Sequence, residues 1–216
     1  MKLFLSSLAV PKSQTVEFLS LVGKPASEIR LALIENAADV YPEERKSFIE
    51  RDRSMLKETG VQITRVDLNK FNGPEEVRQA LQGFDVIWLG GGNAYYLRWV
   101  LKKSGFDQVI RSLLESGTVY GGGSAGAIVA GPTLKHFDLA DEPEKAPELI
   151  EGGLSLTDKV IIPHWGHSRF GEPTRQIKEL FSDGEFQTIE ITDEQAVVIN
   201  ADEVKIIPTN NGKPAK

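Results

Sequence analysis

The feature that most restricts the fold of this chain is a regular alternation of short apolar runs with segments of helical periodicity. The apolar runs read as buried strands at residues 2–8, 29–34, 61–66, 84–89, 118–120 and 160–162. The helical segments between them span residues 43–58, 74–81, 95–101 and 109–114. Such alternation is typical of a mostly parallel sheet with helices on both faces. We therefore predict a doubly wound α/β fold, with the active site at the carboxyl ends of the strands.

The domain organisation follows from length and from a change of pattern near the C-terminus. A chain of 216 residues with 40% hydrophobic residues can bury one core, so we predict a single catalytic domain over residues 1–208. Short β runs at 188–192, 196–200 and 203–208 predict a C-terminal β-meander, and 209–216 reads as a polar tail. Residues 131–153 are rich in proline and acidic residues and predict a mobile flap.

Composition excludes several classes of function. The net charge is −6 and there is no run of basic residues, which argues against binding to nucleic acid or to an anionic membrane. The absence of cysteine removes disulfides, thiolate metal sites and a cysteine nucleophile, and fits a reducing compartment. Ser6 and Ser7 interrupt the first apolar stretch, which favours a buried strand over a signal peptide. We therefore expect a cytoplasmic protein without a membrane span.

Residues 119–127 carry the pattern G-x-S-x-G between an expected strand and an expected helix. At such a turn the backbone is strained and the hydroxyl of Ser124 protrudes, which is the form of a nucleophile elbow. Amides that follow the serine can stabilise an oxyanion. The same glycines also fit the dinucleotide fingerprint G-x-G-x-x-G, but that fingerprint normally occupies the first βα turn of a fold. The context therefore favours a nucleophile.

A second glycine-rich turn, residues 90–92, follows the expected strand 84–89 and opens a helix. Its amides would lie where an anion or oxyanion can bind. The alternative is a simple glycine turn in which Asn93 caps the helix. Three successive glycines exceed what a turn requires, so we favour the functional interpretation.

The chain has three histidines from which a base for Ser124 can come. His164 directly follows the strand 160–162, whereas His136 lies in the irregular segment and His167 lies further into a loop. His164 is therefore the favoured base, with a surface histidine or a metal pair His164-x-x-His167 as alternatives. A zinc site would need a third ligand that the sequence does not supply, and we predict no metal and no cofactor.

A third group should orient the imidazole and stabilise its charged form. Glu194, in the turn between two β runs, is the candidate. Asp193, Asp138 and Asp141 stand behind it as alternatives.

Taken together, four sequence blocks resemble the peptidase E family of serine peptidases. These α-aspartyl dipeptidases are related to cyanophycinases and, more distantly, to class I glutamine amidotransferase-like domains. The matching blocks are residues 86–93 (VIWLGGGN), 120–127 (YGGGSAGA) with 131–133 (GPT), 162–165 (IPHW) and 176–180 (QIKEL). The resemblance extends from the first strand to about Asn200 and implies a doubly wound α/β sandwich.

The resemblance also implies roles for individual residues. Ser124 is the implied nucleophile, His164 the general base and then acid, and Glu194 the third member of the triad. The amides of Gly92 and Ala125 are the implied oxyanion hole.

Substrate recognition departs from the family pattern. The family keeps an arginine near the start of the helix after the catalytic histidine, where this chain has Pro173. Arg169 or Arg175 could substitute as the reader of an aspartyl side chain, and Asn93 is a further candidate for substrate binding.

The sequence thus predicts a serine exopeptidase that acts on short peptides through an acyl-enzyme, with N-terminal aspartate as the candidate specificity. The rival predictions are a catalytically idle ligand-binding or sensor domain of the same fold, and an amide or ester hydrolase with a non-peptide substrate.

Overall fold

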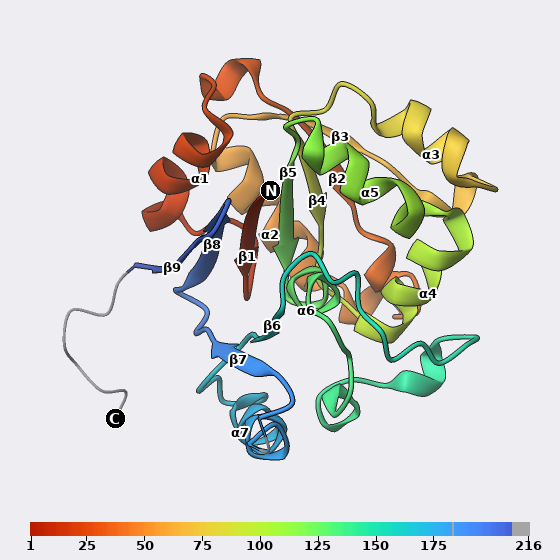
Figure 1. Cartoon of the computed structure of the whole chain (residues 1–216), viewed down its shortest axis with the longest axis vertical. Coiled ribbons are helices and arrows are strands. Elements are labelled where there is room, and N and C mark those ends of the chain that lie inside the picture. The colour runs from red at the N-terminus through yellow and green to blue at the C-terminus, as the bar shows by residue number, and fades with distance from the viewer. Residues whose placement is uncertain (183, 209–216) are drawn as a thin grey trace.

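The centre of the molecule is a seven-stranded sheet with the order β3-β2-β4-β5-β1-β8-β9 (Figure 1). The computed structural model describes residues 1–182 and 184–208, so the expected polar tail 209–216 lies outside the described residues. The parallel strands are β1 (Lys2–Ser6), β2 (Arg30–Ile34), β3 (Gln62–Arg65), β4 (Val86–Leu89) and β5 (Val119–Gly123). Strands β8 (Ala196–Asn200) and β9 (Glu203–Ile207) extend this sheet antiparallel, beside β1.

Helices cover both faces of this sheet, as the alternation predicts. Helices α1 (Thr15–Val22) and α2 (Ser47–Glu58) pack on one face, where Phe18 meets Phe4 and Trp88 in a buried aromatic cluster. The opposite face carries α3 (Pro74–Leu81), α4 (Ala94–Ser104), α5 (Phe106–Glu115) and α6 (Ala125–Ala130). Successive strand residues divide between the two cores, with Phe4 on one side and Leu3 and Leu5 on the other. The doubly wound α/β prediction is confirmed.

Short 3₁₀ turns connect many of these elements. One of them, Glu43–Arg45, occupies the start of the expected helix 43–58, so α2 begins only at Ser47. The other 3₁₀ turns are Lys12–Gln14, Ala26–Glu28, Asn36–Ala38, Leu68–Lys70, Phe137–Leu139 and Pro143–Lys145.

A second, two-stranded sheet lies beside the large one. Strands β6 (Lys159–Ile162) and β7 (Gln187–Glu190) pair in parallel and are joined by helix α7 (Gly171–Leu180). The expected C-terminal meander is therefore reduced to the β8–β9 hairpin, because β7 pairs with β6. A strand that is joined to an earlier strand by a helix can pair with it in parallel, as β7 does with β6. The alternation of residues within a strand does not identify its partner.

Residues 131–153 contain no long element but have several contacts with the rest of the domain. Thr133 forms an isolated antiparallel bridge with Gly152. Arg98 Nε of α4 donates to the carbonyl of Gly152 at 2.7 Å, and Lys102 pairs with Glu148 at 2.7 Å. These contacts hold the expected flap against α4.

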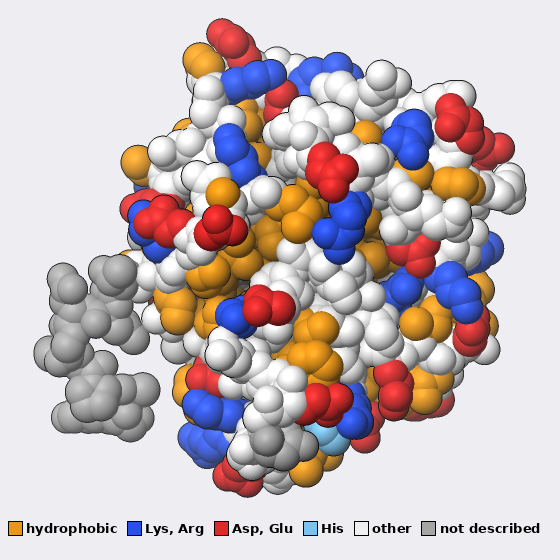
Figure 2. Space-filling view, viewed as in Figure 1, with side chains coloured by type: hydrophobic (Ala, Val, Ile, Leu, Met, Phe, Trp, Pro, Cys, Tyr) orange, Lys and Arg blue, Asp and Glu red, His pale blue; other side chains and the backbone are white. Residues whose placement is uncertain are grey.

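On the face shown in Figure 2, acidic and basic side chains are interspersed, with apolar side chains visible between them. This distribution agrees with a chain whose sequence has no basic run. Over the described residues, no helix has the length and apolar character needed to cross a bilayer.

Candidate active site

Ser124 lies at the turn between β5 and α6 in a strained backbone conformation. Its φ of 50° and ψ of −110° lie outside the regions that L-residues favour, and its amide donates to the carbonyl of Ser6 at 2.9 Å. A Cβ on Gly122 would lie 2.5 Å from the Gly126 carbonyl oxygen, and a Cβ on Gly126 would lie 2.1 Å from that of Leu89. The glycines of the pentapeptide are thus required by close backbone contacts around the serine.

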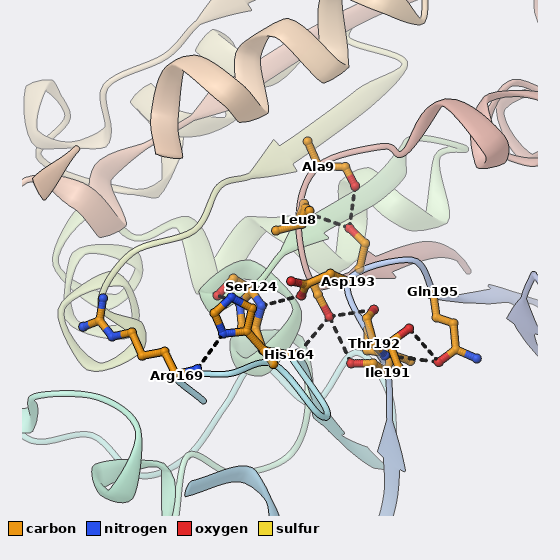
Figure 3. Close-up of polar contacts among 12 residues, drawn as sticks. Leu8, Ala9, Ser124, His164, Arg169, Ile191, Thr192, Asp193 and Gln195 are labelled. Carbon is orange, nitrogen blue, oxygen red and sulfur yellow. Dashed lines mark hydrogen bonds and ion pairs between the residues drawn. The ribbon is translucent and has the colours of Figure 1, made fainter. Parts of the chain in front are cut away.

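His164 follows β6 and contacts the serine through a ring nitrogen. Its Nε2 lies 2.9 Å from Ser124 Oγ, and its Nδ1 lies 2.7 Å from Asp193 Oδ1 (Figure 3). Phe170 stacks on the imidazole with ring centroids 5.0 Å apart and an interplanar angle of 29°. The side chain of His164 is 14% exposed and that of Asp193 is 29% exposed, so both groups are largely shielded from solvent. The three polar groups form a continuous hydrogen-bonded series.

The prediction that Glu194 contacts the imidazole is wrong, because its neighbour Asp193 occupies that position. Glu194 is exposed, and its contact with the interior is through its backbone carbonyl, which accepts from Gln14 Nε2 at 2.6 Å. Adjacent side chains in a tight turn point in different directions, so acidic residues at both positions leave the choice to tertiary structure. Asp141, another alternative, is bound to the backbone of Ala94 instead.

Two opposing effects act on the Asp193 carboxyl. Burial raises its pKa, but the hydrogen bond from His164 and the charges of His164, His167 and Arg51 together hold the pKa below its usual value. Asp193 is therefore ionised at neutral pH. An ionised carboxylate on Nδ1 fixes the tautomer that leaves Nε2 free to accept a proton from Ser124.

A cavity of about 750 Å³ opens over Ser124. Gly91, Gly92 and His164 line it beside the serine. Its apolar lining comprises Leu8, Phe48, Ile128, Phe137, Ala140, Pro163, Phe170 and Ile177. Its charged lining comprises Glu44, Arg45, Arg51, Asp52, Asp141, Glu142, Arg169 and Asp193. This mixture suits a small ligand that carries both apolar and charged groups.

The two arginines expected to read a substrate have different positions. Arg169 lines the cavity, with its guanidinium 5.0 Å from the centre of the Phe170 ring. In Figure 3 the side chain of Arg169 runs away from the histidine rings, on the side opposite to Asp193. The prediction that Arg175 binds substrate is wrong, because Arg175 does not line the cavity. It lies on the outer side of α7, where its side chain is 61% exposed and pairs with Glu172 at 3.4 Å.

The prediction that Asn93 binds substrate is also wrong. It is fully buried and is not part of the cavity lining. Its Oδ1 accepts from the Tyr96 amide at 2.8 Å, which makes it the cap of α4, and its Nδ2 donates to Asp141 Oδ1 and to the Glu142 carbonyl. Asn93 therefore caps α4 and also holds the segment 131–153.

The expected oxyanion residues are Gly92, which lines the same cavity as Ser124, and Ala125, which is adjacent to the serine in the chain. Gly92 lines the cavity with φ of 143°, and a Cβ there would lie 2.3 Å from the carbonyl oxygen of Ala37. Ala125 is the first residue of α6 and directly follows Ser124.

The arrangement disfavours the metal-pair alternative for His164 and His167. Both ring nitrogens of His164 are engaged, one by Ser124 and one by Asp193, and His167 Nδ1 accepts from the Arg169 amide at 3.1 Å. Among residues 1–182 and 184–208, no cluster of three or more histidine or acidic side chains suits a metal ion.

Sequence reasoning missed two residues that support the imidazole, Ser7 and Phe170. Ser7 Oγ accepts from the His164 amide at 2.9 Å. Because Ser7 directly follows β1, the rule that active sites lie at carboxyl strand ends could have identified it. No comparable signal marks Phe170.

Comparison with known proteins identifies the family. The model of peptidase family S51 matches residues 6–207. The chain belongs to this family. Among curated relatives of this S51 peptidase, an uncharacterized peptidase of Pasteurella multocida is 28% identical over 195 residues, covering 90% of this chain and 91% of its own. A protein named peptidase E from Actinobacillus pleuropneumoniae is 27% identical, covering 76% of this chain and 74% of its own.

Solved structures agree with this assignment. A crystal structure assigned to peptidase E, from Listeria monocytogenes EGD-e, superimposes with a TM-score of 0.81 at 27% identity and covers 95% of this chain and 96% of its own. A peptidase from an acI-B1 Actinobacterium shares the fold, with a TM-score of 0.68 at 19% identity over 95% of this chain and 86% of its own. The resemblance to peptidase E is therefore confirmed at the level of family and fold.

Proposed function

We propose that this S51 peptidase is a serine-type exopeptidase that hydrolyses short peptides. Ser124 is the nucleophile, His164 the general base and then acid, and Asp193 the third member of the triad. The observation that carries this proposal is the pair of contacts on one imidazole, 2.9 Å to Ser124 Oγ and 2.7 Å to Asp193 Oδ1. Both distances fall in the range needed for proton transfer and for orientation of the base.

In the proposed reaction, Ser124 Oγ forms a bond to the scissile carbonyl carbon while His164 Nε2 takes the hydroxyl proton. The tetrahedral intermediate collapses, the carbon–nitrogen bond breaks, and Nε2 gives its proton to the leaving amine. Water then attacks the acyl-enzyme, Nε2 takes the water proton, and the proton returns to Ser124 as the acid product leaves. Atoms and charges balance in these steps without a cofactor.

We assign the oxyanion hole to the amides of Gly92 and Ala125. Gly92 borders the cavity beside Ser124, and the Ala125 amide directly follows the nucleophile. Two fixed N–H donors aimed at the developing charge would stabilise the intermediate, and loss of one such donor typically costs about 3 kcal/mol.

For substrate recognition we propose that Arg169 binds a carboxylate, which favours N-terminal aspartate. Arg45 and Arg51 also line the cavity, but they pair with Glu142 at 3.5 Å and Asp52 at 2.8 Å. Within the described part of the chain, the Arg169 guanidinium has no carboxylate partner. A lining arginine whose charge is not neutralised is suited to a carboxylate of the substrate.

We further propose that the enzyme works in the cytoplasm as a single catalytic domain, with short peptides as its ligands and no nucleic-acid or membrane partner. The absence of cysteine and the net charge of −6 support this placement.

The proposal is tested by labelling with a fluorophosphonate, followed by peptide mass spectrometry. A panel of Asp-X, Glu-X, Asn-X and Ala-X dipeptides and simple esters is assayed in parallel. Ser124→Ala is compared with Ser155→Ala, because Ser155 is also a serine with φ of 50° but does not line the cavity.

Ser124→Ala should abolish labelling and lower turnover by about 10⁶-fold, as expected when one member of a triad is removed. Ser155→Ala should keep wild-type turnover and labelling. Absence of labelling and of hydrolysis would support a ligand-binding domain, and hydrolysis of esters alone would support a non-peptide hydrolase. Either result would contradict the proposed function.

A further inference from the structure

The members of the proposed triad come from two different sheets. Ser124 follows β5 of the seven-stranded sheet, whereas His164 follows β6 and Asp193 follows β7 of the two-stranded sheet. No strand pairing joins these two sheets in the described residues. The distance between nucleophile and base therefore depends on packing between the two sheets, which includes the contact of α6 with β6 and hydrogen bonds at the carboxyl ends of the strands.

Ser7 makes such contacts through a single hydroxyl. It follows β1 of the large sheet, and its Oγ accepts from the His164 amide at 2.9 Å. The same Oγ lies 3.1 Å from the carbonyl oxygens of both Ile191 and Thr192, to which it donates. The hydroxyl thus contacts the loop that carries the base and the loop that carries the carboxylate.

The Ser7 hydroxyl is buried, and its single proton is shared between the two carbonyl oxygens. A serine hydroxyl has one proton and can accept from other donors, and Ser7 is 1% exposed. Replacement by alanine would leave the His164 amide without this acceptor and the carbonyls of Ile191 and Thr192 without this donor.

The contacts continue from Ser7 toward Asp193. The Thr192 amide and hydroxyl both donate to Gln195 Oε1, at 3.1 Å and 3.2 Å, and the Gln195 amide donates to the Thr192 carbonyl at 3.0 Å. Figure 3 shows Ile191, Thr192 and Gln195 grouped beside Asp193. This closed turn holds Asp193 and runs directly into β8 of the large sheet, and Ser7 adds hydrogen bonds between the start of the turn and the end of β1.

We propose that Ser7 is a positioning residue that sets the placement of His164 and Asp193 relative to Ser124. The proposal rests on the proposed function, because it assigns Ser7 a role in the reaction of that triad. Ser7 acts through the two loops, and its effect should appear in turnover more than in substrate binding. It should also appear in the chemical shift of the His164 Nδ1 proton, because that proton lies in the hydrogen bond to Asp193.

The test compares Ser7→Ala, Ser7→Thr and Ser104→Ala. Threonine keeps the hydroxyl. Ser104 is an equally buried serine, 1% exposed, whose hydroxyl bonds only within the C-terminal turn of α4 and the start of α5. For each variant we would measure kcat and KM on a cleaved dipeptide, thermal unfolding, and the ¹H and ¹⁵N chemical shifts of the histidine ring N–H groups by NMR. With three histidines in the chain, the His164 signals can be assigned by substitution of the other two.

Ser7→Ala should lower kcat by about 10- to 100-fold with KM changed by less than about threefold, because small misplacements of reacting groups have effects of this size. Its His164 Nδ1 proton signal should move upfield, because the hydrogen bond to Asp193 lengthens. Ser7→Thr should restore most of kcat and the position of this signal, and Ser104→Ala should match wild type.

An unchanged His164 Nδ1 proton signal in Ser7→Ala would overturn the proposal, whatever the change in activity. So would equal losses of kcat in Ser7→Ala and Ser104→Ala. If wild-type protein hydrolyses no substrate and is not labelled, the proposed function fails instead. In that event a moved His164 Nδ1 proton signal in Ser7→Ala would still establish the positioning contact.

Discussion

The large and the small sheet contribute to the site in different ways. On the large sheet, the nucleophile is built by adjacent residues, since Gly122 and Gly126 permit the strained turn at Ser124. On the small sheet, His164 and Asp193 are 29 residues apart and meet because β6 and β7 are parallel neighbours. The comparison teaches that one half of this site is encoded locally, whereas the other depends on the pairing of strands and on a turn.

The largest expected effect tests the half that depends on tertiary structure. Asp193→Asn should lower turnover by about 10⁴-fold, because an amide leaves the imidazole in the wrong tautomer. Glu194→Gln, the matched change at the adjacent exposed residue, should leave turnover within about twofold of wild type. Steady-state kinetics on a cleaved dipeptide measure both. A greater loss in Glu194→Gln would show that the carboxylates exchange roles in solution.

The next prediction tests the locally encoded half. Gly126→Ala should lower the free energy of unfolding by about 3 kcal/mol or more, because its Cβ would lie 2.1 Å from the Leu89 carbonyl oxygen. Gly152→Ala is the control, since no atom lies within 4 Å of the added Cβ. Urea unfolding of both variants provides the measurement. Equal stabilities would mean that the elbow tolerates side chains and that the pentapeptide is not required by packing.

Two carboxyls, one near each sheet, should have pKa values shifted in opposite directions from the usual aspartate value. Asp193 beside the small sheet has a lowered pKa, while burial raises the pKa of Asp141, which caps the turn after β4, to about 6. A raised pKa in the folded state means that the unfolded chain releases this proton first. Ionisation of Asp141 therefore lowers the free energy of unfolding as pH rises from about 4 to 6, by about 3 kcal/mol at most. Ionisation of Asp193 has the opposite effect, because the stabilisation that it gives is present above the pKa of the unfolded chain and is lost as pH falls through the pKa of the folded state.

Carboxyl ¹³C NMR checks this pair directly. Asp141 should titrate near pH 6, and Asp193 should titrate below the usual aspartate range. Loss of the transition near pH 6 in Asp141→Asn would identify the Asp141 carboxyl signal. If both carboxyls titrate together near pH 4, the contrast between the two regions does not hold.

The smallest effect concerns substrate selection beside the small sheet. Wild-type enzyme should favour Asp-X over Asn-X by about 2 kcal/mol in kcat/KM, the typical size of a charge-assisted hydrogen bond. Arg169→Met should remove this preference but keep fluorophosphonate labelling, and Arg175→Met should change neither. Competition assays with paired dipeptides measure the ratio. Equal cleavage of Asp-X and Asn-X by wild type would refute aspartyl specificity while leaving the triad intact.

Much of the fold could be predicted because strands and helices leave local periodic signals. The expected helix 74–81 matches α3, and the strands 29–34 and 84–89 match β2 and β4 to within two residues at each end. The partner of β7 could not be predicted, because alternation within a strand says which side chains are buried and not which strand lies alongside.

The sequence by itself determined the serine elbow and the position of His164 at a strand end. These features depend on backbone sterics and on the order of strands along the chain, and both can be recognised from neighbouring residues in the sequence. Only the tertiary structure decided between Asp193 and Glu194, placed Arg169 in the cavity and Arg175 outside it, and brought Ser7 onto His164. The physical reason is that these choices depend on side-chain direction in turns and on contacts between residues up to 157 positions apart, which no local pattern records.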